Sequence, residues 1–134
     1  MAIDEIKTRL GQLALRVLVV DDNADGAEAL CVCLALMGCT TSVALDGRQG
    51  LAIAATFEPQ LAFIDLEMPD MSGVDVARQL KSARSSARLI CLTGRSQPED
   101  RRLCIDAGFD EFLSKPLPPE KLQQVLDRVK AAIA

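Results

Sequence analysis

Stretches that favour β-strands recur five times along the chain, and polar or turn-forming residues follow each one. Most of these stretches are continuously apolar, as expected for strands that are buried on both faces of a parallel sheet. The clearest is 61–64, which leads directly into Asp65 and a loop that contains Pro69 and Gly73. The predicted strands are 16–20, 40–45, 61–64, 88–92 and 110–113.

Between the predicted strands, apolar residues recur at spacings of three and four, which is typical of helices with one buried face. Gly38 and Gly108 follow two of these stretches and predict where the helices end. The predicted helices are 24–37, 50–57, one that opens at Ser72 or Gly73 and frays at 82–86, 98–107, and one from 118 to 133. This alternation predicts an α/β fold: one domain with a doubly wound parallel sheet, helices on both faces and right-handed connections.

The beginning of the chain lies outside this alternation. Apolar residues with helical spacing are separated there by charged ones; they are Ile3, Ile6, Leu10 and Leu13. We therefore predict an amphipathic extension or connector at 1–15, followed by a domain at 16–134.

Polar side chains follow four of the five predicted strands. Asp21 and Asp22 follow the first, Asp65 the third, Thr93 the fourth and Lys115 the fifth. Any one of them could be a helix cap or a solvated loop residue. Because the carboxyl ends of parallel strands lie at one edge of the sheet, where ligands bind in open α/β folds, we expect all five to converge.

The converging side chains predict a site for a phosphoryl group. Three carboxylates in one cleft repel one another unless a cation joins them, and Mg²⁺ prefers such oxygen ligands. Lys115 adds a positive charge and Thr93 adds a hydroxyl donor. A carboxylate in this setting can act as a nucleophile and form an aspartyl phosphate, with the cations offsetting charge on the transferred oxygens.

The composition of the chain argues against several kinds of site and of binding partner. The 134 residues include no His, Trp or Tyr, which excludes His-based metal sites and Ser-His-Asp triads. The net charge of -4 argues against direct nucleic-acid binding through a broad basic face. The five cysteines form no C-x-x-C pair, so we expect no disulfide framework. The compartment that we expect for this protein is therefore a reducing cytoplasm. No signal peptide or run of about 20 apolar residues is present, and we expect no membrane insertion.

The motifs at these strand ends resemble, as a set, those of the receiver domain of two-component response regulators. The segments that carry the resemblance are 17–23, 65–73, 92–94 and 112–116, and the likeness extends from Arg16 to Ile133. The resemblance implies a (βα)5 fold of the flavodoxin-like kind with strand order 2-1-3-4-5.

The resemblance also implies a role for each site residue. Asp65 would accept phosphate from the phosphohistidine of a histidine kinase or a histidine phosphotransfer protein. Asp21, Asp22 and Asp65 would hold Mg²⁺ together with the backbone carbonyl of Glu67. Thr93 and Lys115 would contact the phosphoryl oxygens, and the bond from Lys115 to Pro116 would be cis.

Phe112 matches the family's switch aromatic, which packs inward when Thr93 is drawn to the phosphate; an ordinary core ring is the alternative. Such a domain is a phosphoacceptor switch that catalyses only its own phosphorylation and dephosphorylation. Glu67 and Arg95 either pair over the mouth of the site and slow hydrolysis, or are two solvated charges.

The output surface is expected at the predicted helix 98–107, the following strand and the last helix, where an unknown downstream protein would bind. Dimerisation on phosphorylation is left open. No output domain follows Ala134, so we expect a stand-alone receiver or a receiver that belongs to a longer chain, such as a hybrid sensor kinase in a phosphorelay.

Three other classes of protein share part of this pattern. An aspartate-nucleophile phosphatase of the haloacid-dehalogenase type needs a second Asp two residues after the nucleophile, where this chain has Glu67. A flavodoxin-like electron carrier needs a phosphate-binding loop after the first strand and aromatic residues that stack on flavin, but Asp21 and Asp22 occupy that loop. A pseudo-receiver would not need the full set of acids.

Overall fold

The computed structural model describes residues 2–3, 14–94 and 98–133. Strands and helices alternate through this part of the chain as the apolar pattern predicts. The strands are β1 (Arg16–Val20), β2 (Thr40–Ala44), β3 (Leu61–Asp65), β4 (Arg88–Thr93) and β5 (Glu111–Ser114). The helices are α2 (Ala24–Leu36), α3 (Gly47–Phe57), α4 (Gly73–Ser82), α5 (Pro98–Ala107) and α6 (Pro119–Ile133). The amphipathic extension or connector predicted at 1–15 lies largely outside the described residues.

The strands form one parallel sheet in the order β2-β1-β3-β4-β5, which confirms the order that the resemblance implies. Their register brings the polar strand ends to the same edge. Asp65 at the end of β3 pairs with Leu92 of β4, and the next residue, Thr93, pairs with Ser114 of β5. Parallel pairing therefore aligns the positions that sequence reasoning selected.

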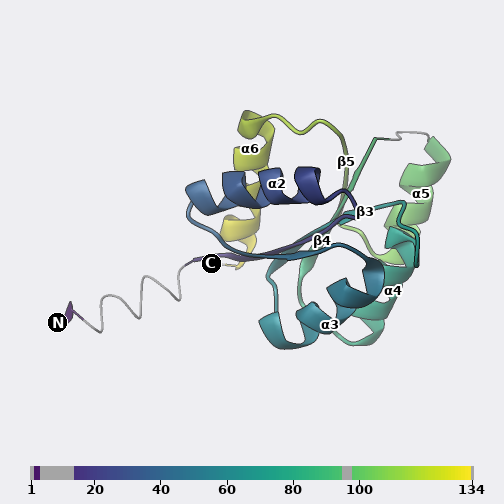
Figure 1. Cartoon of the computed structure of the whole chain (residues 1–134), viewed down its shortest axis with the longest axis horizontal. Helices are drawn as coiled ribbons and strands as arrows, with labels where there is room; N and C mark the ends of the chain where they lie inside the picture. Colours follow the sequence, from purple (N-terminus) through teal and green to yellow (C-terminus); the bar gives the residue numbers. More distant parts are fainter. Residues whose placement is uncertain (1, 4–13, 95–97, 134) are drawn as a thin grey trace.

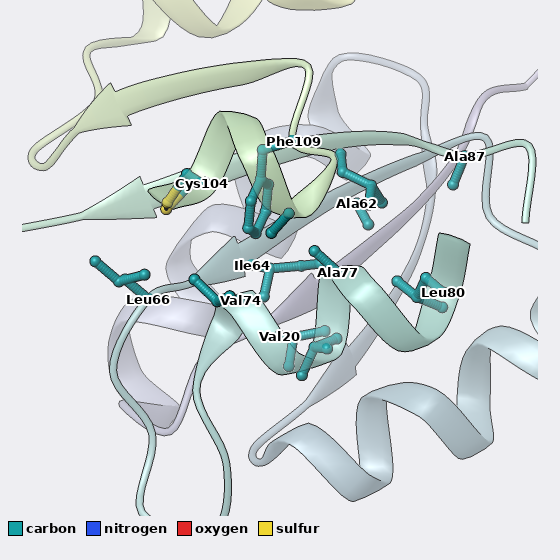
Figure 2. Close-up of a cluster of buried hydrophobic side chains, with 14 of the residues drawn as sticks. Val20, Ala62, Ile64, Leu66, Val74, Ala77, Leu80, Ala87, Cys104 and Phe109 are labelled. Carbon is teal, nitrogen blue, oxygen red and sulfur yellow. The ribbon is translucent and has the colours of Figure 1, made fainter. Parts of the chain in front are cut away.

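Helices cover both faces of the sheet, because successive strand residues point to opposite sides (Figure 1). Val17 and Val19 pack with α2 and α6 on one face, in what we call the α2–α6 core. Leu18 and Val20 pack with α3, α4 and α5 on the other, in the α3–α5 core. Figure 2 shows part of the α3–α5 core, where side chains of the strands meet those of α4 and α5.

The predicted start of α3 at residue 50 is wrong by nearly one turn. The helix begins at Gly47 because two acidic side chains bind its free N–H groups. Asp46 accepts a hydrogen bond from Gln49 N at 2.7 Å, and the Asp70 carboxylate accepts from Gly47 N and Arg48 N, both at 3.0 Å. Asp70 belongs to the loop after β3, so this cap joins two segments that are distant in sequence.

Helix α2 exposes more apolar surface than its predicted single stripe allows. Only Ala27 and Leu34 of this helix are buried, while Val32 is 59% exposed and Leu36 is 84% exposed. An exposed helix normally carries polar residues on its outer side. Among the described residues, no helix combines the length and the apolar character needed to cross a bilayer.

Candidate functional site

Asp21 is held in place at the end of β1 by contacts to both carboxylate oxygens. Its backbone N–H donates to Ala44 O at 3.0 Å, so the chain continues along the sheet for one residue beyond the strand. Oδ1 accepts from Asn23 N at 3.0 Å, and Oδ2 accepts from Lys115 Nζ at 2.7 Å. The residue is 7% exposed, so its charge is shielded from solvent and tied to that of Lys115.

Asp21, Asp22 and Asp65 form one acidic cluster, as the sequence predicts. Each offers a carboxylate oxygen, and these three oxygens lie within 4.8 Å of one another. Asp21 is buried, Asp65 is intermediate and Asp22 is exposed, so the cluster opens to solvent on one side. The donors are all hard oxygens with no thiolate or imidazole among them, and this donor set fits Mg²⁺.

Lys115 provides the positive charge of the site. Its Nζ lies 2.7 Å from Asp21 Oδ2 and 3.7 Å from Asp65 Oδ1, so one ammonium group bridges two of the three acids. The backbone N–H of Lys115 donates to Thr93 O at 2.7 Å, which fixes the end of β5 against β4. The bond between Lys115 and Pro116 is cis, in agreement with the resemblance.

Burial and charge oppose each other at Asp65. The pKa of this carboxyl is raised from 3.8 to about 6 as the net result: burial raises it most, the charge of Lys115 lowers it, and the charges of Asp21 and Asp22 raise it. Burial alone would lower the pKa of Lys115, but its hydrogen bond to Asp21 and the charge of Asp65 outweigh this effect and raise it. Asp65 is therefore an anion that the fold holds at some cost, with a fully charged ammonium group beside it.

Thr93 and Phe112 lie on adjacent strands near this edge. Thr93 ends β4 and is 2% exposed, whereas Phe112 lies within β5 and is 7% exposed. The Arg101 guanidinium carbon lies 5.4 Å from the centroid of the Phe112 ring, a distance at which a cation and an aromatic face attract each other.

Glu67 follows β3 by two residues and is exposed. The role of its backbone carbonyl as a metal ligand stays a prediction. Arg95, its predicted partner over the mouth of the site, lies outside the described residues.

Gly73 contributes to the site by its lack of a side chain, a role that sequence reasoning did not identify. Its N–H donates to Leu66 O at 2.8 Å, and a Cβ at this position would lie 2.2 Å from Asp65 O. The start of α4 therefore packs directly against the backbone of the central acid. A glycine close after a strand-end acid was the available signal, although a turn explains it equally well from sequence.

A groove beside the acidic cluster is the second feature that sequence reasoning missed. It has a volume of about 540 Å³, and Asp21 and Lys115 line it together with mainly apolar residues. These include Gly26, Ala29, Leu30 and Cys33 of α2, together with Leu117 and Leu122. We call it the α2 groove. The excess of apolar residues on α2 was its signal in the sequence.

Comparison with known proteins agrees with this geometry. The family described as response regulator receiver domain matches residues 17–127. The chain is 37% identical over 118 residues to the DNA-binding response regulator MtrA of Mycolicibacterium paratuberculosis, covering 88% of this chain and 51% of the relative. It is 34% identical over 121 residues to response regulator MprA of Mycolicibacterium vanbaalenii, covering 90% and 51%. The chain thus spans about half the length of these curated relatives.

Solved structures support the same assignment. A CheY-like response regulator receiver domain protein from Methanospirillum hungatei superposes with a TM-score of 0.84 at 25% identity, over 89% of this chain and 95% of that one. The chemotaxis protein CheY4 of Vibrio cholerae superposes with a TM-score of 0.82 at 28% identity, over 87% and 98%. With the predicted motifs, the strand order and the acidic edge in agreement, the chain belongs to the response regulator receiver domain family.

Proposed function

We propose that Asp65 accepts a phosphoryl group from the phosphohistidine of a histidine kinase or a histidine phosphotransfer protein. A carboxylate oxygen of Asp65 attacks phosphorus, the phosphorus–nitrogen bond breaks, and its electron pair stays on the imidazole of the donor. The product is an aspartyl phosphate. The observation that carries this proposal is the bridging of Asp21 and Asp65 by Lys115 Nζ, at 2.7 and 3.7 Å, within a cluster of three acids.

We propose that Asp21, Asp22 and Asp65 hold Mg²⁺, with the backbone carbonyl of Glu67 as a further ligand. The ion would supply positive charge for the oxygens of the transferred group. Lys115 supplies the second positive charge and can move from its bridging position to a phosphoryl oxygen, since its flexible stem carries a compact ammonium group. The hydroxyl of Thr93 donates a hydrogen bond to the same group.

Phosphorylation would then act as a switch. A phosphate at Asp65 draws Thr93 toward it, and the space that Thr93 leaves is filled by repositioning the Phe112 ring on the neighbouring strand. The chain catalyses only its own phosphorylation and dephosphorylation. We assign 16–134 to the receiver domain and 1–15 to an extension or connector, and we propose that the protein works in the cytoplasm without binding nucleic acid through this domain.

We further propose that the phosphohistidine-bearing helix of the donor protein docks in the α2 groove. A donor must bring its imidazole to Asp65, and this groove shares Asp21 and Lys115 with the site. Ala29 and Val32 are exposed apolar residues of α2, and an amphipathic helix buries such residues when it lies in a groove.

The experiment that tests this function is Mg²⁺-dependent labelling of the purified chain with radioactive acetyl phosphate. We expect about one phosphoryl group per chain at most, no label with excess chelator, and no label on Asp65→Asn. Asp106→Asn is the matched control, because Asp106 is an exposed aspartate of α5 and should label normally. Undiminished labelling of Asp65→Asn, or steady turnover of a generic phosphate ester without a labelled chain, would contradict the proposal.

A further inference from the structure

Two thiols that the proposed function does not use lie in contact inside the α3–α5 core. Cys91 is in β4 and Cys104 is in α5, and both are 0% exposed. Cys104 Sγ donates a hydrogen bond to Cys91 Sγ over 3.3 Å. Figure 2 labels Cys104 in this cluster together with Phe109 and Ile64. Two side chains from elements 13 residues apart therefore bring sulfur against sulfur.

The other three cysteines are arranged differently. Cys31 and Cys33 are half-buried on α2, two residues apart on a helix, where side chains two residues apart do not face each other. Cys39 is buried in the α2–α6 core. In the part of the chain that the structure describes, the contact between Cys91 and Cys104 is the one hydrogen bond between two thiols. It is also placed where a covalent bond would join a helix to the sheet.

We propose that Cys91 and Cys104 are a redox site, in which hydrogen peroxide converts the thiol pair into a disulfide that fastens α5 to β4. One thiol is first oxidised to a sulfenic acid as peroxide is reduced, with release of water. The second thiol attacks that sulfur, the S–O bond breaks, and the hydroxyl leaves as a second water with the thiol proton. The balance is two thiols and one peroxide giving one disulfide and two waters.

The geometry requires only a short approach of the two sulfurs. A disulfide holds its sulfurs about 2.05 Å apart, so the present separation of 3.3 Å must fall by roughly 1.2 Å. Peroxide must also reach the core. Only Cys104 and Ala107 of α5 are buried, so few apolar contacts hold this helix and a local opening exposes both thiols. Burial raises the pKa of both thiols, so the reaction is slow at neutral pH.

The position of the bond would make it regulatory, and this part rests on the proposed function. Cys91 pairs in register with Phe112 and lies two residues before Thr93. Phe112 and Thr93 are the two residues proposed to move when a phosphoryl group binds at Asp65. A bond from Cys91 to α5 fastens the helix that Phe112 and Thr93 must move against, so the oxidised chain should bind a phosphoryl group less well.

The first arm of the experiment tests the bond itself. The full chain is treated with hydrogen peroxide, free thiols are blocked, and peptides are mapped by mass spectrometry. We expect a peptide pair joined through residues 91 and 104 that has lost two hydrogen atoms and is restored by reductant. Cys33→Ala should retain it, and Cys104→Ser should lose it. A joined pair involving residues 31, 33 or 39 instead, or only sulfinic acid at 91 and 104, would overturn the proposal.

The second arm tests the consequence by equilibrium binding of beryllofluoride, a phosphoryl mimic, in the presence of Mg²⁺. We expect oxidation to weaken binding at least about fivefold in the wild type and to leave binding by Cys104→Ser unchanged. Equal binding by oxidised and reduced wild type would overturn the regulatory role. A reduced wild type that fails to bind beryllofluoride would overturn the proposed function and this regulation together, whereas the disulfide mapped in the first arm would still decide the redox site.

Discussion

Asp65 is the residue at which the opposing forces of the site meet. A carboxyl group that is partly buried at the end of a strand, near two other acids, is costly to ionise. Lys115 offsets part of this cost, although its Nζ lies closer to Asp21 than to Asp65. The cluster therefore favours the entry of a cation, which relieves a repulsion between carboxylates already present in the fold.

This balance predicts how stability depends on pH. The folded chain holds the Asp65 proton up to about pH 6, whereas the unfolded chain releases it near its usual value of 3.8. Between these values the unfolded state binds fewer protons, so ionisation of Asp65 destabilises the fold progressively as pH rises. With chelator present, Asp65→Asn should therefore be more stable than wild type above about pH 7, by about 1 to 2 kcal/mol after allowance for solvent screening.

Urea denaturation of wild type and of Asp65→Asn across this pH range measures the difference in their free energies of unfolding. This difference should shrink as the pH falls from about 6 to about 4 and disappear at lower pH, where Asp65 is protonated in both states. A variant that is less stable than wild type at neutral pH would mean that the ion pair with Lys115 outweighs burial.

At the residue scale, the sequence predicted where the polar side chains stand but not how they pair. Asp21, Asp65, Thr93 and Lys115 each follow an apolar run, and parallel pairing is enough to bring them to one edge. The preference of Lys115 for Asp21 depends on side-chain orientation after the last strand, which no local pattern encodes. The same is true of the close approach of Gly73 to Asp65, because it depends on how α4 meets the sheet.

At the scale of elements, the junction of β3 and α4 is a point where packing leaves no spare room. Gly73→Ala would put a methyl group 2.2 Å from Asp65 O, so α4 or the end of β3 must shift. We expect a loss of about 1 to 3 kcal/mol in the free energy of unfolding, typical of overpacking, together with slower labelling by acetyl phosphate.

Gly26→Ala is the matched control for this substitution. A Cβ there would meet its nearest neighbour at 3.5 Å, an ordinary contact, and Gly26 lies within a helix. We expect it to raise the free energy of unfolding by about 0.5 to 1 kcal/mol. Equal effects of the two substitutions in urea denaturation would contradict the proposed close approach.

The exposed apolar side of α2 gives a prediction about the donor protein. Ala29→Arg places a long charged side chain in the α2 groove, so it should slow phosphotransfer from a phosphohistidine protein by about tenfold or more. Acetyl phosphate is too small to need the groove, and its labelling rate should be unchanged. Ile105→Arg is the control, because Ile105 is exposed on α5, on the opposite face of the sheet from α2. This substitution should leave both rates unchanged. A parallel fall in both rates for Ala29→Arg would show that the site itself is disturbed.

The apolar periodicity of the helices explains which of their predicted faces and bounds were right and which were wrong. The last helix is strongly amphipathic, and four residues of its predicted apolar face are buried: Leu122, Val125, Leu126 and Val129. Ile133, predicted on the same face, is 47% exposed at the end of the helix. Helix α2 is apolar on nearly every side, so spacing alone could not separate its buried side from the α2 groove. The start of α3 depends on two acids. Asp46 directly precedes the helix, where Asp is a common N-cap, whereas Asp70 comes from another loop that no pattern within the helix could predict.

At the scale of the whole molecule, one topological fact produces the site. Five parallel strands in the order β2-β1-β3-β4-β5 place the ends of β1, β3, β4 and β5 side by side, so residues that are up to 94 positions apart come into contact. The strand order itself could be expected only from the resemblance, because the alternation of strand and helix does not determine which strands are neighbours.

The central claim is that this shared edge makes Asp65 a phosphoacceptor, and chemical trapping tests it most directly. Borohydride reduces an aspartyl phosphate to homoserine, which peptide sequencing by mass spectrometry locates to a single residue. After treatment of the wild-type chain with acetyl phosphate and Mg²⁺, the account predicts homoserine at position 65. Homoserine at position 21, 22 or any other aspartate, or none at any position in a chain that carries label, would contradict it.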